Sequence, residues 1–372
     1  MNTNHANHDA SSCPIIDCDI HQPELTREQW VSVLPEPYKS EVAQYGTRSI
    51  RSGIRTEDGG LRRDLLGEID GLRLKDPAFY SKQLFDRYNI RYGILSAGAG
   101  PTAGIPDPDY AAAIARGMND FYLEHWLPKD ERFLLTIHIT QADPELAVRE
   151  IERLAGTPRM VAVSFHATAN RIPFGSRYYW PIYEACEKHG LALHIHPSTT
   201  ATIANAAMTP AGQCPTYLES HVCMPQFFMA QVASFVFGGV FEKFPGLRVM
   251  LVEGGVSWLP HLLWRMDAEF KGLRHQTPFL KRMPSEYVFE NVRLISQPVE
   301  EPPKQEYLLQ IFEMINAHRM LMYSSDFPHW DFDEPVRIPR ALGAETRKRI
   351  LHDNACEFLN LPAYQPAEVQ TA

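Results

Sequence analysis

The sequence lacks the features that mark secreted, disulfide-stabilised or membrane-spanning proteins. Residues 1–12 are polar, without the basic start and apolar stretch of a signal peptide. No run approaches the roughly 18 uninterrupted apolar residues of a transmembrane helix. The six cysteines include no CxxC pair, and a chain of 372 residues does not need disulfides to fold. We therefore expect a cytoplasmic protein with reduced thiols, a disordered leader over residues 1–14 and no membrane partner.

An excess of basic charge is also absent. Lys and Arg total 36 and Asp and Glu total 45, which gives a net charge of −9 spread along the chain. This balance offers no electrostatic support for a nucleic-acid partner. The 44% of hydrophobic residues can bury a large core. We expect one domain over residues 15–360, followed by a tail over residues 361–372.

Eight short apolar runs rich in β-branched residues alternate with helix-like stretches. Eight strands form a closed (β/α)8 barrel, so we predict an α/β protein with the TIM-barrel fold. Most runs end in polar or ionisable residues, and the C-terminal ends of barrel strands carry the active site. The predicted strands are Ile15–His21, Tyr92–Ala97, Phe133–Ile139, Val161–His166, Leu191–His196, Arg248–Glu253, Val292–Gln297 and Met320–Ser325. The predicted helices include Pro106–Leu123, Pro144–Ala155, Trp180–His189, Val256–Arg274 and Pro303–Ala317.

Two connections between the predicted strands are insertions. Residues 22–79 are too long for an ordinary connection of about 2–6 residues, and we expect them to form a cap over the barrel mouth. In this cap, Arg48, Arg51 and Arg55 are candidates for binding the carboxylate of a small anionic substrate through forked hydrogen bonds. A solvated arginine surface is the alternative. The second insertion covers residues 198–224.

Four potential metal ligands stand at the ends of the first, fifth and eighth predicted strands. The two-residue period of a strand places Asp19 and His21 on one face. His196 ends the fifth strand, and Asp326 follows the eighth. Imidazole and carboxylate suit zinc, manganese or iron, and catalytic sites leave a position open for water or substrate. We predict that these four residues hold a catalytic metal.

Further candidates stand at the same rim. Glu253 ends the sixth predicted strand, and His329 follows Asp326 by three residues. Both are candidate metal ligands and catalytic residues; the alternatives are a carboxylate paired with an arginine and a histidine that only hydrogen-bonds Asp326. His221, in the second insertion, is a third catalytic candidate. His166, at the end of the fourth strand, is a candidate for substrate binding, or else a buried structural histidine.

Five motifs gather these residues: Asp17–His21, His196-Pro197, Phe241–Gly255, Trp258-Leu259-Pro260 and Ser325–His329. In them the chain resembles, over nearly the whole barrel, the amidohydrolase-related family that includes aminocarboxymuconate-semialdehyde decarboxylase and metal-dependent aromatic-acid decarboxylases. The resemblance implies one metal on a first-strand pair, a fifth-strand histidine and an eighth-strand aspartate, which correspond here to Asp19, His21, His196 and Asp326. The chain departs from the family in its first ligand, an aspartate. It also has Glu253 where the decarboxylases have a histidine that acts beside the metal.

The glutamate favours an oxidative function. It cannot replace a cationic imidazole at neutral pH unless burial raises its pKa strongly, but it is a good ligand or bridge for a second metal. We expect a dinuclear Fe or Fe/Mn centre that hydroxylates a small carboxylate or amino acid with O2 and electrons from an external donor. The chain is similar in this respect to the dinuclear offshoot of the family exemplified by 2-aminoisobutyrate hydroxylase. The expected ligands are Asp19, His21, His196, Glu253, Asp326 and His329.

Two other functions remain open. In one, a single Zn or Mn serves decarboxylation or hydrolysis of a small carboxylic acid, with Glu253 or His329 moving protons. In the other, the chain is a metal-binding but inactive barrel that supports a related active subunit. The apolar stretch Phe227–Phe241 can serve association into a homo- or hetero-oligomer, or it can pack as a barrel helix.

Overall fold

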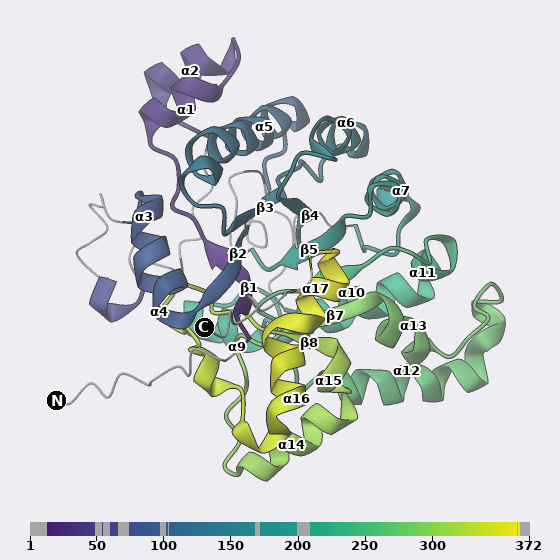
Figure 1. The fold of residues 1–372 in the computed structure, drawn as a ribbon. Helices are drawn as coiled ribbons and strands as arrows, with labels where there is room; N and C mark the ends of the chain where they lie inside the picture. Colours follow the sequence, from purple (N-terminus) through teal and green to yellow (C-terminus); the bar gives the residue numbers. More distant parts are fainter. Residues whose placement is uncertain are drawn as a thin grey trace, which may run out of the picture.

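The core of the protein is a parallel sheet of eight strands arranged in the order β1 to β8 (Figure 1). The computed structural model describes residues 13–48, 54, 60–65, 74–96, 102, 104–167, 172–198, 209–362 and 364. The strands are β1 Ile15–His21, β2 Ile90–Ser96, β3 Phe133–Ile137, β4 Met160–His166, β5 Ala192–His196, β6 Val249–Leu251, β7 Val292–Ile295 and β8 Leu321–Met322. The sheet closes where Cys18 N donates to Tyr323 O at 2.9 Å and His21 N donates to Phe327 O at 2.7 Å. The predicted TIM barrel is confirmed.

The interior of the barrel is apolar at one end and polar at the other. Near the strand starts, Ile16 and Ile94 belong to a buried cluster that includes Phe358 from the C-terminal helix. At the other end, His166 of β4 lies beside His196 of β5 in the parallel register, and both are buried. All eight strands run in one direction, so polar residues distant in sequence meet at a single rim.

Helices surround the barrel, and local capping explains where several begin. The side chain of Asp107 accepts a hydrogen bond from Tyr110 N at 3.2 Å, and Pro108 follows it at the start of α5. Asp143 and Pro144 begin α6 in the same way. The helices are α1 Arg27–Val33, α2 Tyr38–Tyr45, α3 Pro77–Tyr80, α4 Asp86–Tyr88, α5 Pro108–His125, α6 Pro144–Leu154, α7 Trp180–His189, α9 Tyr217–Cys223, α10 Pro225–Phe237, α11 Val240–Lys243, α12 Leu259–Leu273, α13 Pro284–Asn291, α14 Gln305–Met314, α15 Ala317–Met320, α16 Gly343–Lys348 and α17 Asn354–Leu359.

The described parts of the first insertion lie in two places: against the side of the barrel and at its rim. Helices α1 and α2 lie beside α5 on the outside (Figure 1). Nearer the rim, Leu61 forms an antiparallel bridge with His329, and the Tyr80 hydroxyl donates to the backbone oxygen of His21 at 2.8 Å. Part of the insertion therefore touches the strand ends. A cap over the mouth remains a prediction, because most of residues 49–59 and 66–73 lie outside the described residues.

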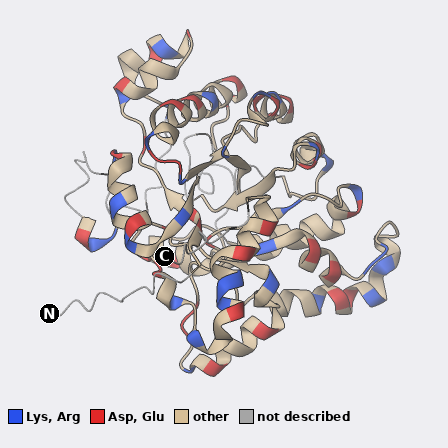
Figure 2. Cartoon of the chain, viewed as in Figure 1, with Lys and Arg blue, Asp and Glu red and all other residues tan. Residues whose placement is uncertain are grey.

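Both signs of charge are interspersed over the outer helices (Figure 2). Among the residues that the structure describes, no helix has the length and apolar character that crossing a membrane requires.

The apolar stretch that the sequence offered for oligomerisation includes α10, in which Phe228 and Phe235 are fully buried within the single chain. These two side chains therefore pack as barrel-helix residues, which was the simpler of the two expectations.

Candidate metal centre

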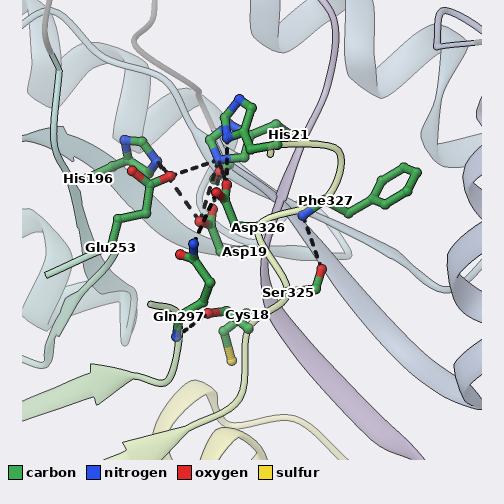
Figure 3. Close-up of polar contacts among 12 residues, drawn as sticks. Cys18, Asp19, His21, His196, Glu253, Gln297, Ser325, Asp326 and Phe327 are labelled. Carbon is green, nitrogen blue, oxygen red and sulfur yellow. Dashed lines mark hydrogen bonds and ion pairs between the residues drawn. The ribbon is translucent and has the colours of Figure 1, made fainter. Parts of the chain in front are cut away.

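Acidic and histidine side chains from four parts of the barrel converge at the rim (Figure 3). His21 lies at their middle. Its Nε2 atom is 2.8 Å from Asp326 Oδ1, 3.2 Å from Glu253 Oε1 and 3.5 Å from Asp19 Oδ2. The side chains of all four residues are at most 10% exposed. The predicted strand-end ligands on β1 and after β8 are thus brought into contact.

His196 completes this group from β5. Its Nε2 atom lies 2.8 Å from Glu253 Oε1 and 4.0 Å from Asp19 Oδ2. Its Nδ1 atom lies 2.6 Å from the backbone oxygen of Pro197, an arrangement in which Nδ1 carries the proton and donates it. A histidine held in this way offers the lone pair of Nε2 to a metal, because the backbone contact fixes the tautomer.

Two ligand candidates sit on unusual backbone conformations. Glu253 has a φ of 58° and Asp326 has a φ of 57°, in the left-handed region that non-glycine residues seldom adopt. Such conformations cost on the order of 1–3 kcal/mol each and gather at functional sites. The backbone N–H of Asp326 donates to Asp19 O at 3.1 Å, which ties the β8 loop to β1. Both turns direct their carboxylates into the cluster (Figure 3).

The donor set fits a divalent cation. Ligand atoms of the residues fall into two overlapping groups, within each of which the atoms lie within 4.8 Å of one another. Within the described residues, Asp19 Oδ2 is buried and has no hydrogen-bond partner. A buried carboxylate oxygen without a donor is costly unless a cation satisfies it. The first group is Asp19, His21, His196 and Glu253, and the second is His21, Glu253, Asp326 and His329.

Burial and neighbouring charges both shift the pKa values of the cluster, and the direction of the shift differs from residue to residue. Burial acts to raise the pKa of Glu253, but His196 and His21 outweigh it and hold that pKa well below its usual range. Burial, Glu253 and Asp331 raise the pKa of Asp326 well above its usual range. For His21, burial acts to lower the pKa, but its neighbouring aspartates raise it well above the usual value. Protons on the imidazoles thus offset the carboxylates, a role that a metal takes over as it displaces those protons.

The structure separates the other predicted residues. His166 is buried beside His196 in the barrel wall, and burial, then the neighbouring histidines, lowers its pKa to about 3, so its ring is neutral. His221 lies on α9, where its Nε2 atom is 3.2 Å from Asp331 Oδ2. His221 therefore contacts Asp331 and is not a member of either group of potential metal ligands. His329 joins the cluster directly, with Nδ1 2.7 Å from Asp326 Oδ1.

The arginine candidates do not reach the centre in the described residues. Arg48 is 44% exposed and pairs with Glu41 at 2.6 Å and Asp107 at 2.8 Å. These two carboxylates occupy the guanidinium at the outer surface, so the structure does not bring Arg48 to the metal cluster. Arg51 and Arg55 lie outside the described residues.

Sequence reasoning missed two polar residues that hold the ligands. The Ser96 hydroxyl donates to Asp19 Oδ1 at the end of β2. Gln297, after β7, places its Nε2 atom 3.3 Å from Asp326 Oδ2 and 2.8 Å from Asp331 Oδ2. A signal existed, since both residues end predicted strands or stand next to their ends at the rim. Neither side chain ionises, so neither belongs to the pattern of acidic and histidine residues that predicts the site.

The chain is similar to proteins that are decarboxylases. It is 27% identical to the gamma-resorcylate decarboxylase of Polaromonas sp. over 302 residues, which cover 78% of this chain and 89% of that protein. It is 24% identical to the 2-amino-3-carboxymuconate-6-semialdehyde decarboxylase of Dictyostelium discoideum over 263 residues, which cover 68% of each. One solved structure is the 5-carboxyvanillate decarboxylase of Novosphingobium aromaticivorans complexed with manganese and 4-hydroxy-3-methoxy-5-nitrobenzoic acid. It has a TM-score of 0.67 at 19% identity and covers 94% of this chain and 97% of that one.

These findings overturn the expectation of a dinuclear oxygenase, which is wrong. The relatives are decarboxylases, and the non-oxidative alternative fits them better. The preference for iron, for O2 and for an electron donor loses its support with it. The error had a physical origin: Glu253 was taken as the mark of a second metal. In the structure its Oε1 atom lies against His21 and His196, and Glu253 belongs to both overlapping groups, so its presence alone does not establish a second metal.

The family assignment rests on most of the chain. The amidohydrolase family model matches residues 16–361, from the second residue of β1 to beyond the last helix. The fold, the rim cluster and this match support an enzyme that depends on a divalent metal. The chain belongs to the amidohydrolase family.

Proposed function

We propose that this chain is a manganese-dependent, non-oxidative decarboxylase of a small aromatic or unsaturated carboxylic acid. The observation that carries the proposal is the convergence of Asp19, His21, His196 and Asp326 at the rim of the barrel. The names of the relatives supply the reaction class, and the neighbour complexed with manganese and a nitro-substituted aromatic acid supplies the metal and substrate class.

The four convergent residues would hold the cation, and Glu253 completes their surroundings. The cation would supply Lewis-acid polarisation of the substrate carboxylate or of a neighbouring oxygen. Glu253 contacts the Nε2 atoms of both His21 and His196 through one oxygen. That oxygen faces the same nitrogen atoms that would bind the cation, so Glu253 would lie beside the cation as a further ligand.

Decarboxylation replaces a carboxylate on carbon with hydrogen, so the site must deliver one proton to that carbon. Asp326 and His329 are the residues that we assign to this proton transfer. His329 Nδ1 lies 2.7 Å from Asp326 Oδ1. The His329 side chain is 18% exposed and the Asp326 side chain 2% exposed, so the pair runs from the solvent side into the buried centre. The donor must stand within hydrogen-bond reach of the reacting atom, which a rim carboxylate allows.

His166 is our candidate for orienting the substrate. It lies beside His196 in the register of β4 and β5. Its buried Nδ1 atom has no hydrogen-bond partner among the described residues. A neutral imidazole can donate one hydrogen bond and accept another, which suits a hydroxyl or carbonyl group on an acid substrate.

Metal-assisted hydrolysis is the second candidate, because Glu253 stands where the resembling decarboxylases have a histidine. A carboxylate next to two metal-binding imidazoles can accept a proton from water, as metal-dependent hydrolases require. Amide or lactone cleavage without release of CO2 would select this function.

The proposal is tested by CO2 release under strict anaerobiosis. Chelator-treated protein reloaded with Mn²⁺ is supplied with hydroxybenzoates and carboxylated unsaturated acids, and CO2 is measured together with the decarboxylated product. We expect equal amounts of both, lost in Asp326→Asn. Asp353→Asn, near the start of β1, is the matched control and should retain activity. Absence of CO2 from the whole panel in Mn²⁺-loaded protein would contradict the proposal.

A further inference from the structure

We propose that Gln297, held in place by Asp331 and His221, is a positioning residue that fixes the carboxylate of Asp326 and thereby sets how tightly the centre binds its divalent cation. The inference rests on the metal centre of the proposed function, but it does not depend on which substrate the enzyme uses.

Gln297 is a neutral donor between two carboxylates. Its side chain is completely buried after β7, and its backbone N–H donates to the Ser324 hydroxyl at 3.2 Å. Its Nε2 atom lies 2.8 Å from Asp331 Oδ2 and 3.3 Å from Asp326 Oδ2. An amide nitrogen carries two N–H groups, so one Gln297 side chain can donate to both. In Figure 3 the amide points into the cluster toward Asp326.

The orientation of the Gln297 amide follows from these neighbours. The reverse orientation would direct the amide oxygen at two carboxylate oxygens, and no donor would lie between them. With Nε2 inward, both carboxylates receive a hydrogen bond. Gln297 Oε1 is then left without a partner among the described residues, which is the smaller loss.

The two oxygens of Asp326 consequently have different partners. Oδ1 faces His21 Nε2 at 2.8 Å and His329 Nδ1 at 2.7 Å, whereas Oδ2 is held by Gln297. If the plane of the carboxylate turned away from this orientation, the contacts on both sides would break. Because Gln297 is uncharged, it fixes the carboxylate without cancelling the negative charge that attracts a cation. A lysine or arginine in its place would cancel that charge.

Asp331 and His221 hold the other side of the amide. Asp331 Oδ2 accepts from Gln297 and lies 3.2 Å from His221 Nε2. The His221 ring also packs against Trp330, with ring centroids 5.5 Å apart. Since His221 belongs to α9, this contact joins the second insertion to the β8 loop. A continuous set of polar contacts thus runs from α9 to the metal ligand Asp326.

The test is the affinity of the chelator-treated full-length protein for Mn²⁺, measured by titration calorimetry. Gln297→Met keeps the length of the side chain and removes both donors. We expect its dissociation constant for Mn²⁺ to rise at least about tenfold, the loss typical of removing a group that orients a metal ligand. Asp331→Asn should weaken binding less, and its effect should vanish when Gln297→Met is already present, because both act through the same amide.

Gln231→Met is the matched control. Gln231 also bridges two groups, donating to Ala167 O at 3.0 Å and accepting from Phe174 N at 3.0 Å, but both of these partners are backbone groups. Its dissociation constant for Mn²⁺ should stay within twofold of the wild-type value. An unchanged dissociation constant in Gln297→Met, or equal losses in both methionine variants, would overturn the inference.

Two further readouts separate positioning from a general loss of structure. The thermal unfolding of the metal-free Gln297→Met protein should stay close to that of the metal-free wild type, and excess Mn²⁺ should restore its turnover. If Gln297→Met does not fold, His221→Ala takes its place as the test. We expect its dissociation constant for Mn²⁺ to rise severalfold. An unchanged dissociation constant would overturn the inference that the contacts from α9 hold Asp326 in position. These titrations need no substrate, so they hold even if the enzyme proves not to be a decarboxylase.

Discussion

Glu253 Oε1 lies 2.8 Å from His196 Nε2, and the same oxygen lies 3.2 Å from His21 Nε2. A single carboxylate oxygen therefore contacts imidazoles from β5 and β1. The left-handed backbone at Glu253, followed by Gly254 and Gly255, makes this approach possible. The residue in which this chain departs from the decarboxylases that it resembles thus lies within the cluster of candidate ligands.

Replacement of that carboxylate should weaken the centre. Glu253→Gln keeps the shape of the side chain but removes the charge that attracts both the cation and the two imidazoles. We expect at least about a tenfold loss in Mn²⁺ affinity and in CO2 release. Glu300→Gln is the control, because Glu300 accepts from Val256 N and Ser257 N outside the cluster. Wild-type affinity in Glu253→Gln would show that Glu253 plays no part in binding the metal.

Removal of Arg48 should leave catalysis intact. Its guanidinium is exposed and already paired with Glu41 and Asp107, and exposed ion pairs contribute little to stability. We expect Arg48→Ala to change neither the KM for the acid substrate nor the unfolding temperature appreciably. A KM that rises tenfold would restore the earlier hypothesis that Arg48 holds the substrate carboxylate.

Stability should fall in mild acid because His138 is buried in its neutral form. Burial, then His194, lowers the pKa of His138 to about 3. Between that value and the ordinary pKa of about 6.5, the unfolded chain binds a proton that the folded chain does not, so stability decreases as pH falls. From pH 7 to pH 5 this single group costs about 2 kcal/mol. Urea unfolding at the two pH values should show a smaller decrease in His138→Gln; an equal decrease would contradict the assignment.

The close packing around Gly93 of β2 predicts that an added methyl group there lowers the stability of the fold. A Cβ atom at Gly93 would lie 2.5 Å from Phe85 Cε1 and 2.9 Å from Ile20 Cδ1. We expect Gly93→Ala to lower the free energy of unfolding by about 1–3 kcal/mol, the cost of overpacking. Gly272→Ala, in α12, meets no atom within 4 Å and should be neutral or slightly stabilising. Equal unfolding midpoints in urea for the two variants would show that β2 moves to accept the methyl group.

Local sequence pattern was sufficient to predict the barrel and the candidate ligands that meet at its rim. Apolar, β-branched runs identify buried parallel strands, and β1 was predicted with the bounds that it has in the structure. The shorter β7 and β8 ended earlier than predicted, because residues such as Gln297 and Ser325 leave the sheet to form the rim. Asp19, His21 and His196 became candidate ligands because they lie at or near strand ends, and the strand ends of a parallel barrel meet at one rim. The structure brings their side chains together, and their role as metal ligands stays a prediction.

The reaction could not be read from the ligands, since the same carboxylates and imidazoles suit several metals and reactions. The relatives corrected the oxygenase hypothesis where ligand counting had failed.

The pairing of residues far apart in the chain was decided only by the tertiary structure. No local pattern joins His221 of α9 to Asp331, or Gln297 to Asp326. Nor does any pattern show that Arg48 lies against Asp107 at the outer surface. Strand periodicity sets which side chains face the barrel mouth, because it depends on neighbours in the chain. Partners between loops depend on how the insertions fold back, which is set by the packing of the whole molecule.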